Sequence, residues 1–375
     1  MKNFWRWTLK TVLWLILIAF LALAAGFFAV RFGWTKVAGE ENTDSFEYNL
    51  EAKKDITLLA PDIVKLPTAG SVYGPHEKAN RCKIEVARRY NDYVTASILG
   101  VYLQTHSELL LDKMLLAMKL RLPSRQIFGD ELLNCETIPG NPPSLSDLVA
   151  SLANPKDGNI YTWQTGEPWQ IIRGALINDK KNIDDAALAA GVQPRLLLSV
   201  AIVEQLRLYY TQRELFEKFF KPLKILANAN KMAWGVMSIK EDMAIQTENF
   251  LTDKNSDFYP GDQYKNLLDF PPGVDKSKER YNRLTDDHNH YYSYLYGALI
   301  IKELESQWLK AGYSLEYRPE IISTLFNIGF DHSIPKADPL VGGSTLDIAG
   351  EKYFFGSLAY EFYYSGELAT EFPFN

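Results

Sequence analysis

Hydrophobic residues recur at helical spacing along most of the chain. Between Ala79 and Leu122 apolar positions repeat every three or four residues and predict a pair of helical segments, the second of which runs from Leu109 to Leu122 and ends at Pro123. The pattern does not decide between helix and strand for Tyr353 to Tyr364. Elsewhere the helical spacing predicts a mainly α-helical protein. Further helices are expected at about 168–178, 183–190, 194–210, 212–228, 239–251, 287–311 and 318–327.

Stretches rich in proline, glycine and acidic residues divide these helices into regions. Residues 37–78 show little periodicity and are typical of a linker. A proline-rich stretch then separates a helical accessory region, expected at 79–154, from a larger domain at 155–375. Within that domain, segment 252–286 carries Asp, Asn, Pro and Gly throughout and is expected to be a long loop.

Residues 1–36 have the pattern of a short cytoplasmic tip followed by a transmembrane anchor. Three basic residues precede an uncharged run from Thr11 to Val30, which as a helix spans about 30 Å of hydrocarbon. Because basic residues favour the cytoplasmic side, we expect a single-pass membrane protein with a cytoplasmic N-terminus. In a bacterium with two membranes, the anchor lies in the inner membrane and the main domain in the periplasm. A cleaved signal peptide is the alternative, since Ala22-Leu23-Ala24 resembles a signal peptidase site.

Charge and cysteine content narrow the classes of function. The net charge is −6 and the basic residues are dispersed, which argues against nucleic-acid binding. The spacing of His288 and His290 does not place them on one helix face, so we expect solvated loop residues and neither a metal site nor a cofactor. In an oxidising compartment Cys82 and Cys135 can form a disulfide, and two buried free thiols fit equally well.

Glu204 is the only charged residue in the apolar run from Leu196 to Leu206. A helix that is hydrophobic nearly all round belongs in a core, where an unpaired carboxylate costs several kcal/mol to ionise. Such a group is either paired or kept as an acid for chemistry. Arg207, three residues further on, is placed to be the partner in the first case.

Four segments carry a resemblance to a known family. Ala189 to Pro194 forms a Gly-Val turn that leads into the helix ending in Glu204, and Trp234 to Ile239 reads Trp-Gly-Val-Met-Ser-Ile. Downstream, the aromatic helix from Tyr294 to Leu304 precedes Leu325 to Gly329, which reads Leu-Phe-Asn-Ile-Gly. In content and order these segments resemble the motifs of the soluble lytic transglycosylases and goose-type lysozymes, across about residues 155–335.

The resemblance implies a lysozyme-like helical domain that cleaves the MurNAc–GlcNAc glycosidic bond of peptidoglycan. Glu204 is then the general acid and base, and the sugar's own groups complete a 1,6-anhydro product. One or two of Tyr291, Tyr292, Tyr294 and Tyr296 are expected to touch the glycan, the rest being core. The residues that the resemblance places at the substrate are Gly235, Met237, Ser238, Tyr294, Phe326 and Asn327.

Alternative functions remain open at this point. Most glycosidases use a second carboxylate. The candidates in this sequence are expected to be surface acids, which favours the scheme with a single acid. These candidates are Glu241, Asp242, Glu248, Asp286 and Asp287. Gln205, Ser238 and Phe326 stand where the family has Ser, Gln and Tyr, which supports a protein that binds peptidoglycan or an envelope partner without cleavage. A third hypothesis is a helical envelope protein whose helices at 79–122 dock a partner.

Overall fold

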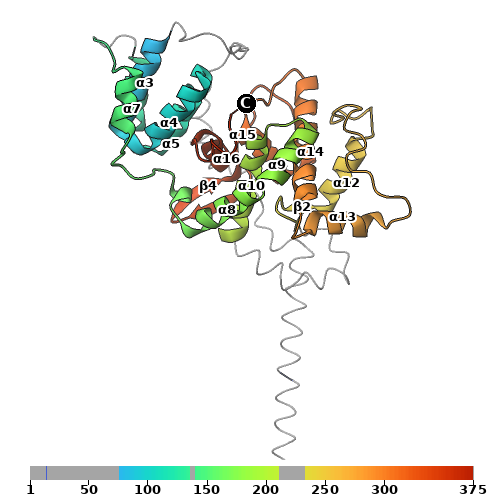
Figure 1. The fold of residues 1–375 in the computed structure, drawn as a ribbon. Helices are drawn as coiled ribbons and strands as arrows, with labels where there is room; N and C mark the ends of the chain where they lie inside the picture. The colour runs from blue at the N-terminus through green and yellow to red at the C-terminus, as the bar shows by residue number, and fades with distance from the viewer. Residues whose placement is uncertain (1–13, 15–75, 136–139, 211–232, 375) are drawn as a thin grey trace, which may run out of the picture.

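The protein is mainly helical, as the hydrophobic pattern predicts (Figure 1). The structure, a computed structural model, describes Trp14 and residues 76–135, 140–210 and 233–374. Apart from Trp14, the expected membrane anchor at 11–30 lies outside the described residues, as do residues 37–75 of the linker expected at 37–78 and the helix expected at 212–228. The end of that linker is helical instead, since a helix begins at Glu77. Within the described ranges, no helix is both long enough and apolar enough to cross a membrane.

The N-terminal helices group into a bundle at one side of the remaining chain (Figure 1). Three of them stand where the sequence predicted a pair of helical segments at 79–122, and two follow where helices were not predicted; the second expected segment, Leu109 to Leu122, matches α5 closely, and the first is divided into α3 and α4. They are α3 (Glu77–Tyr90), α4 (Asp92–Thr105), α5 (Glu108–Arg121), α6 (Arg125–Leu133) and α7 (Leu145–Leu152). We refer to α3–α7 as the N-terminal bundle.

Polar residues between these helices set where each begins. Asn91 Oδ1 accepts a hydrogen bond of 2.8 Å from the main-chain N–H of Val94, at the start of α4. Ser107 Oγ accepts one of 3.2 Å from the N–H of Leu110, at the start of α5. These side chains satisfy N–H groups that lack a partner within the helix. The apolar run is therefore divided into three helices that fold back on one another.

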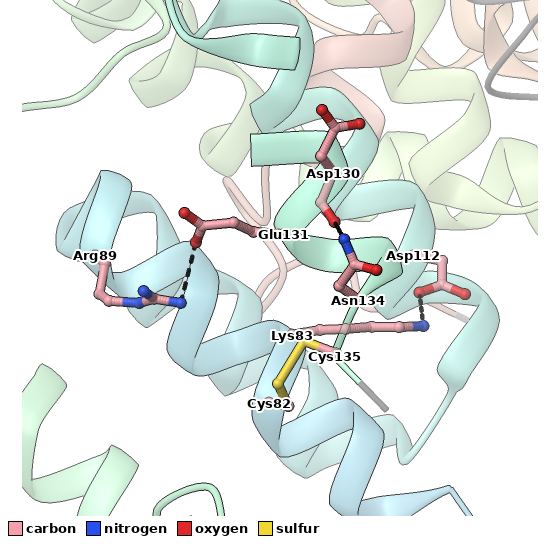
Figure 2. The surroundings of a disulfide bond; sticks show 8 residues. All are labelled: Cys82, Lys83, Arg89, Asp112, Asp130, Glu131, Asn134 and Cys135. Atoms are coloured by element: carbon pink, nitrogen blue, oxygen red, sulfur yellow. Dashed lines mark hydrogen bonds and ion pairs between the residues drawn. A yellow bond between two sulfur atoms is a disulfide. The ribbon is translucent and has the colours of Figure 1, made fainter. Parts of the chain in front are cut away.

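A disulfide between Cys82 and Cys135 ties α3 to the end of α6 (Figure 2). The two Cα atoms lie 5.6 Å apart, and the residues are separated by 53 positions in the sequence. This decides between the two alternatives that the sequence left open. Next to the disulfide Lys83 on α3 pairs with Asp112 on α5, with Nζ 2.6 Å from Oδ1, so the same helix edge is also held by charge (Figure 2).

The larger part of the chain is a helical assembly with two short antiparallel hairpins. In β1–β2 Trp234 pairs with Ile239, and in β3–β4 Leu346 pairs with Tyr353. The elements are η2 (Thr162–Gln164), α8 (Glu167–Asn178), α9 (Lys180–Ala190), α10 (Pro194–Tyr210), β1 (Ala233–Trp234), β2 (Ile239–Lys240), α12 (Glu241–Phe250), α13 (Lys276–Thr285), α14 (Tyr291–Lys310), α15 (Pro319–Ile328), η3 (Phe330–His332), β3 (Thr345–Ile348), β4 (Glu351–Phe354) and α16 (Phe355–Tyr364).

Two sequence predictions are corrected in this part. Segment 252–286 was expected to be a loop throughout, but its end forms α13. This helix begins where Asp275 Oδ1 accepts hydrogen bonds from the N–H groups of Ser277 and Lys278, at 3.0 and 3.2 Å. The aromatic segment at 353–364, for which periodicity gave no decision, ends β4 and then forms α16.

Helix α10 lies at the centre of the assembly and packs against α8, α9, α14, α15 and α16. Contact on so many sides explains why its sequence is apolar nearly all round. Its first turn carries Arg195, whose side chain is fully buried. The guanidinium donates hydrogen bonds to the main-chain carbonyls of Phe362, Tyr363, Glu367 and Phe372, at 2.9 to 3.2 Å. Arg195 therefore fixes the start of α10 to the end of α16.

We expect Arg195→Lys to lower the free energy of unfolding by about 3 kcal/mol or more, because one ammonium group with three donors cannot replace a planar guanidinium that serves four carbonyls. Urea unfolding measures the change. Arg173→Lys is the matched control, since Arg173 is half-exposed in its ion pair with Glu367, and we expect a change below about 1 kcal/mol. Equal effects of the two substitutions would contradict this role of Arg195.

Candidate functional site

Glu204 lies in the second half of α10 and is 3% exposed. Arg207, one turn further along the helix, donates to Glu204 Oε2 from Nε at 3.1 Å and also from Nη2. Both side chains are largely buried. The carboxylate is therefore ion-paired in this structure, which is the first of the two alternatives weighed from the sequence. An acid role requires the carboxyl to carry a proton when a substrate is bound.

The turn that contains Gly235 is held directly against α10. Gln205, the neighbour of Glu204, donates from Nε2 to the carbonyl oxygen of Val236 at 2.5 Å. Gly235 itself has φ +68°, a conformation that side-chain-bearing residues avoid. A Cβ at this position would clash with the carbonyl oxygen of Leu284 and come within 2.6 Å of Ser293 Oγ. Glycine is thus required here both by conformation and by space.

The next two residues of the turn differ in what their side chains can do. Met237 is fully buried, and its N–H donates to Ser293 Oγ at 3.3 Å. Ser238 is 9% exposed, and its buried Oγ has no hydrogen-bond partner among the described residues. Its φ of +51° is also unusual for a residue with a side chain. Met237 therefore packs in the core, while the Ser238 hydroxyl retains its capacity to bind.

Helix α14 packs close behind this turn because it carries Gly297 at the contact. A Cβ there would come within 2.6 Å of Met237 Cε and 3.4 Å of Leu197 Cδ1 on α10. Tyr294, one turn earlier, is buried, and its hydroxyl donates to Asp179 Oδ2 at 3.0 Å. Burial and this bond raise the pKa of the Tyr294 phenol. In this structure Tyr294 is buried and ties α14 to the start of α9.

His290 joins the same contact, contrary to the expectation of a solvated loop residue. Its Nδ1 lies 2.6 Å from Asp179 Oδ2, and the imidazole is partly buried. The hydrogen bond to Asp179 raises the pKa of His290. Burial alone would raise the pKa of Asp179, but the bond and charge of His290 bring it below its usual value. His288 is exposed as expected, and no cluster of three or more metal-ligating side chains occurs in the described part of the chain.

Helix α15 brings Asn327 and Phe326 to another side of α10. Phe326 is 3% exposed and belongs to the core. Asn327 is half-buried, and its Oδ1 accepts hydrogen bonds from the N–H and the hydroxyl of Ser344, at 2.8 and 3.0 Å. These bonds fix the orientation of the amide plane. They leave Nδ2 as the donor group that Asn327 can offer to a ligand.

The candidate second carboxylates divide into two kinds. Glu241 was expected at the surface but is buried, where it accepts a hydrogen bond of 2.7 Å from Ser277 Oγ. Glu248 is half-buried and forms a two-point ion pair with Arg280, at 2.6 and 2.7 Å, and accepts from the Tyr296 hydroxyl. Both carboxylates therefore fasten α12 to α13 or α14. As expected, the others are exposed: Asp242, Asp286 and Asp287.

The geometry thus gathers three distant segments around α10, namely the Gly235 turn, α14 and α15. The sequence did not indicate the roles of Gln205, Asp179 or Arg280, because each acts through a partner 31 or more residues away. No protein-family model matches the chain, and comparisons with curated proteins and with solved structures gave no match. The interpretation of the site therefore depends on its own residues.

We expect Gly235→Ala to destabilise the fold by about 3 kcal/mol or more, because it combines a left-handed conformation with a clash against the main chain. Thermal and urea unfolding provide the measurement. Gly273→Ala is the matched control: Gly273 also has positive φ, +80°, but a Cβ there would meet no atom within 4 Å beyond its chain neighbours. Its cost should stay near 1–2 kcal/mol, and a similar cost at both positions would show that the close approach at Gly235 is unimportant.

Proposed function

We propose that this chain is a membrane-anchored peptidoglycan lytic transglycosylase of the lysozyme-like class, with Glu204 as its general acid and base. The observation that carries the proposal is the packing of the Gly235 turn against the Glu204 helix through Gln205 and Val236. The two segments are separated by a stretch of sequence, and their direct contact supports a common role at one site. The expected anchor at 11–30 would hold the domain at the periplasmic face of the inner membrane.

The proposed reaction needs one carboxyl group. Protonated Glu204 donates its proton to the glycosidic oxygen, and the bond from that oxygen to the anomeric carbon of MurNAc breaks. The carboxylate then takes the proton of the 6-hydroxyl, whose oxygen bonds to the anomeric carbon and closes the 1,6-anhydro ring. No water is consumed, and Glu204 regains its proton. The engagement of Glu241 and Glu248 in ion pairs with Arg280 supports a scheme without a second carboxylate.

Other residues have supporting roles in this scheme. In the proposed complex Asn327 Nδ2 donates to a sugar carbonyl or hydroxyl group, and the buried Ser238 Oγ does so once substrate binding uncovers it. Arg207 has to release Glu204 before the carboxyl can hold a proton. The two residues lie one turn apart on the same helix, and in this scheme rotation of the Arg207 side chain frees the carboxyl.

A second candidate function is peptidoglycan or envelope-partner binding without cleavage. The ion pair between Glu204 and Arg207 favours it, because a carboxylate held by a guanidinium is in the wrong state for proton donation. The replacement of the family's Gln by Ser238 also removes an amide from the site. In this case Glu204 has a structural role and the same surface only holds the glycan.

We expect Glu204→Gln to lower the release of muropeptides from purified sacculi by about 1,000-fold or more, because an amide cannot donate the proton that the leaving oxygen requires. Mass spectrometry of the soluble products distinguishes an anhydro end from a reducing end. Glu167→Gln, an exposed acid on α8, is the control and should retain full activity.

Four results would decide between the candidates. Anhydro products from the wild type that Glu204→Gln abolishes support the transglycosylase, and reducing ends indicate a hydrolase that uses the same acid. Sacculus binding without any soluble product supports the second candidate. Full activity of a folded Glu204→Gln variant would remove Glu204 from the mechanism.

A further inference from the structure

A buried polar cluster lies where the N-terminal bundle meets the rest of the chain. Arg121, the last residue of α5, donates from Nε to Glu361 Oε1 on α16 at 2.5 Å. Its Nη1 donates to Glu351 Oε2 on β4 at 3.1 Å. The guanidinium also lies 4.1 Å from the centre of the Tyr353 ring. One arginine of the bundle therefore contacts two elements of the larger part.

Glu361 is the most deeply buried charged group of this cluster, with no exposed surface. Arg121 bonds only Oε1 of this carboxyl, and the Trp163 indole interacts with Glu361 as a neutral hydrogen-bond donor that lowers its pKa. Tyr161 Oη, which has no hydrogen-bond partner among the described residues, belongs to the same surroundings: burial raises the pKa of Tyr161, and the Glu361 charge raises it further. These side chains thus form one buried polar group with a single cation.

This arrangement makes ionisation of Glu361 costly. A fully buried carboxylate needs strong partners to compensate its loss of hydration, and here these are one guanidinium, at Oε1, and one neutral indole. Burial raises the pKa of Glu361 to about 7, although the charge and hydrogen bond of Arg121 oppose the rise. The neighbouring Glu351 carboxylate raises it further. The groups that face Glu361 are Arg121 from α5, Glu351 and Tyr353 from β4, and Tyr161 and Trp163 from the η2 segment.

We propose that Glu361 is a proton-controlled latch between the N-terminal bundle and α16, closed when its carboxyl is protonated and loosened when it ionises. Helix α5 packs against α16 around this point, and Tyr360 adds a hydrogen bond of 3.3 Å to the carbonyl oxygen of Lys113. Opening the contact exposes Glu361 to water, where it ionises at its ordinary pKa near 4.5. This inference does not depend on the function proposed above.

The direction of the pH effect follows from the raised pKa. Between about pH 4.5 and 7 the closed state holds a proton that the open state has lost, so rising pH favours opening. Above about pH 7 both states are ionised and the effect levels off. For these two pKa values the equilibrium constant for opening rises about tenfold from pH 6 to pH 8. The bundle is therefore held most tightly on the acidic side of neutrality.

Hydrogen–deuterium exchange of the full chain in detergent micelles tests the latch. Protection factors of peptides from α5 and α16, corrected for the intrinsic pH dependence of exchange, should fall about tenfold between pH 6 and pH 8 in the wild type. Glu361→Gln, which cannot ionise, should show no such fall. An unchanged pH dependence in this variant, or none in the wild type, would overturn the proposal.

Two further variants keep the test decisive. Glu303→Gln removes another fully buried carboxyl, on α14, whose pKa burial also raises well above its usual value; it should leave the pH response of α5 and α16 as in the wild type. If Glu361→Gln does not fold, Arg121→Met gives an independent result. Loss of the guanidinium should move the midpoint of opening to higher pH, and an unchanged midpoint would contradict the latch.

Discussion

The hydrogen bonds of buried Arg195 are the interaction on which the arrangement of the larger part depends. A fully buried guanidinium is costly, and burial lowers its pKa to about 10, so it remains charged at neutral pH. Four main-chain carbonyls at the end of α16 and beyond it compensate this cost. Two of them, those of Phe362 and Tyr363, belong to the last turn of α16 and also carry the partial negative charge of a helix C-terminus. The first turn of α10 and the last turn of α16 therefore stabilise each other, and Glu204 lies on a helix whose position is fixed.

Close approach of backbones then determines what surrounds α10. Gly297 lets α14 reach Met237 and α10, and Gly235 lets its turn reach the Leu284 carbonyl. Gly356 has the same effect between α16 and α15, where a Cβ would lie 2.5 Å from the carbonyl oxygen of Glu320. At each contact a side chain would force the elements apart. The packing around the candidate site is thus specified as much by missing side chains as by apolar ones.

The sequence predicted the features that depend on local order. The apolar run of α10 and its bounds, Pro194 to Tyr210, follow from hydrophobic spacing and a proline in the first turn. The same reasoning missed α13, whose buried Arg280 and Arg283 appear as surface charges in a polar sequence. It identified Glu204 and its local partner Arg207. It did not identify Gln205 with Val236 or Arg121 with Glu361, because pairing across 31 or 240 residues leaves no periodic signal.

Sequence separation also distinguishes the roles that buried carboxyls can take in this protein. Glu204 has its cation three residues away on the same helix, so this pair joins no separate elements of the fold. Glu361 has its cation on a helix of the N-terminal bundle, so that pair is part of the contact between α5 and α16. The first arrangement suits the exchange of partners that the proposed function requires, because no contact between elements depends on it. The second suits a group whose protonation is coupled to the docking of the bundle.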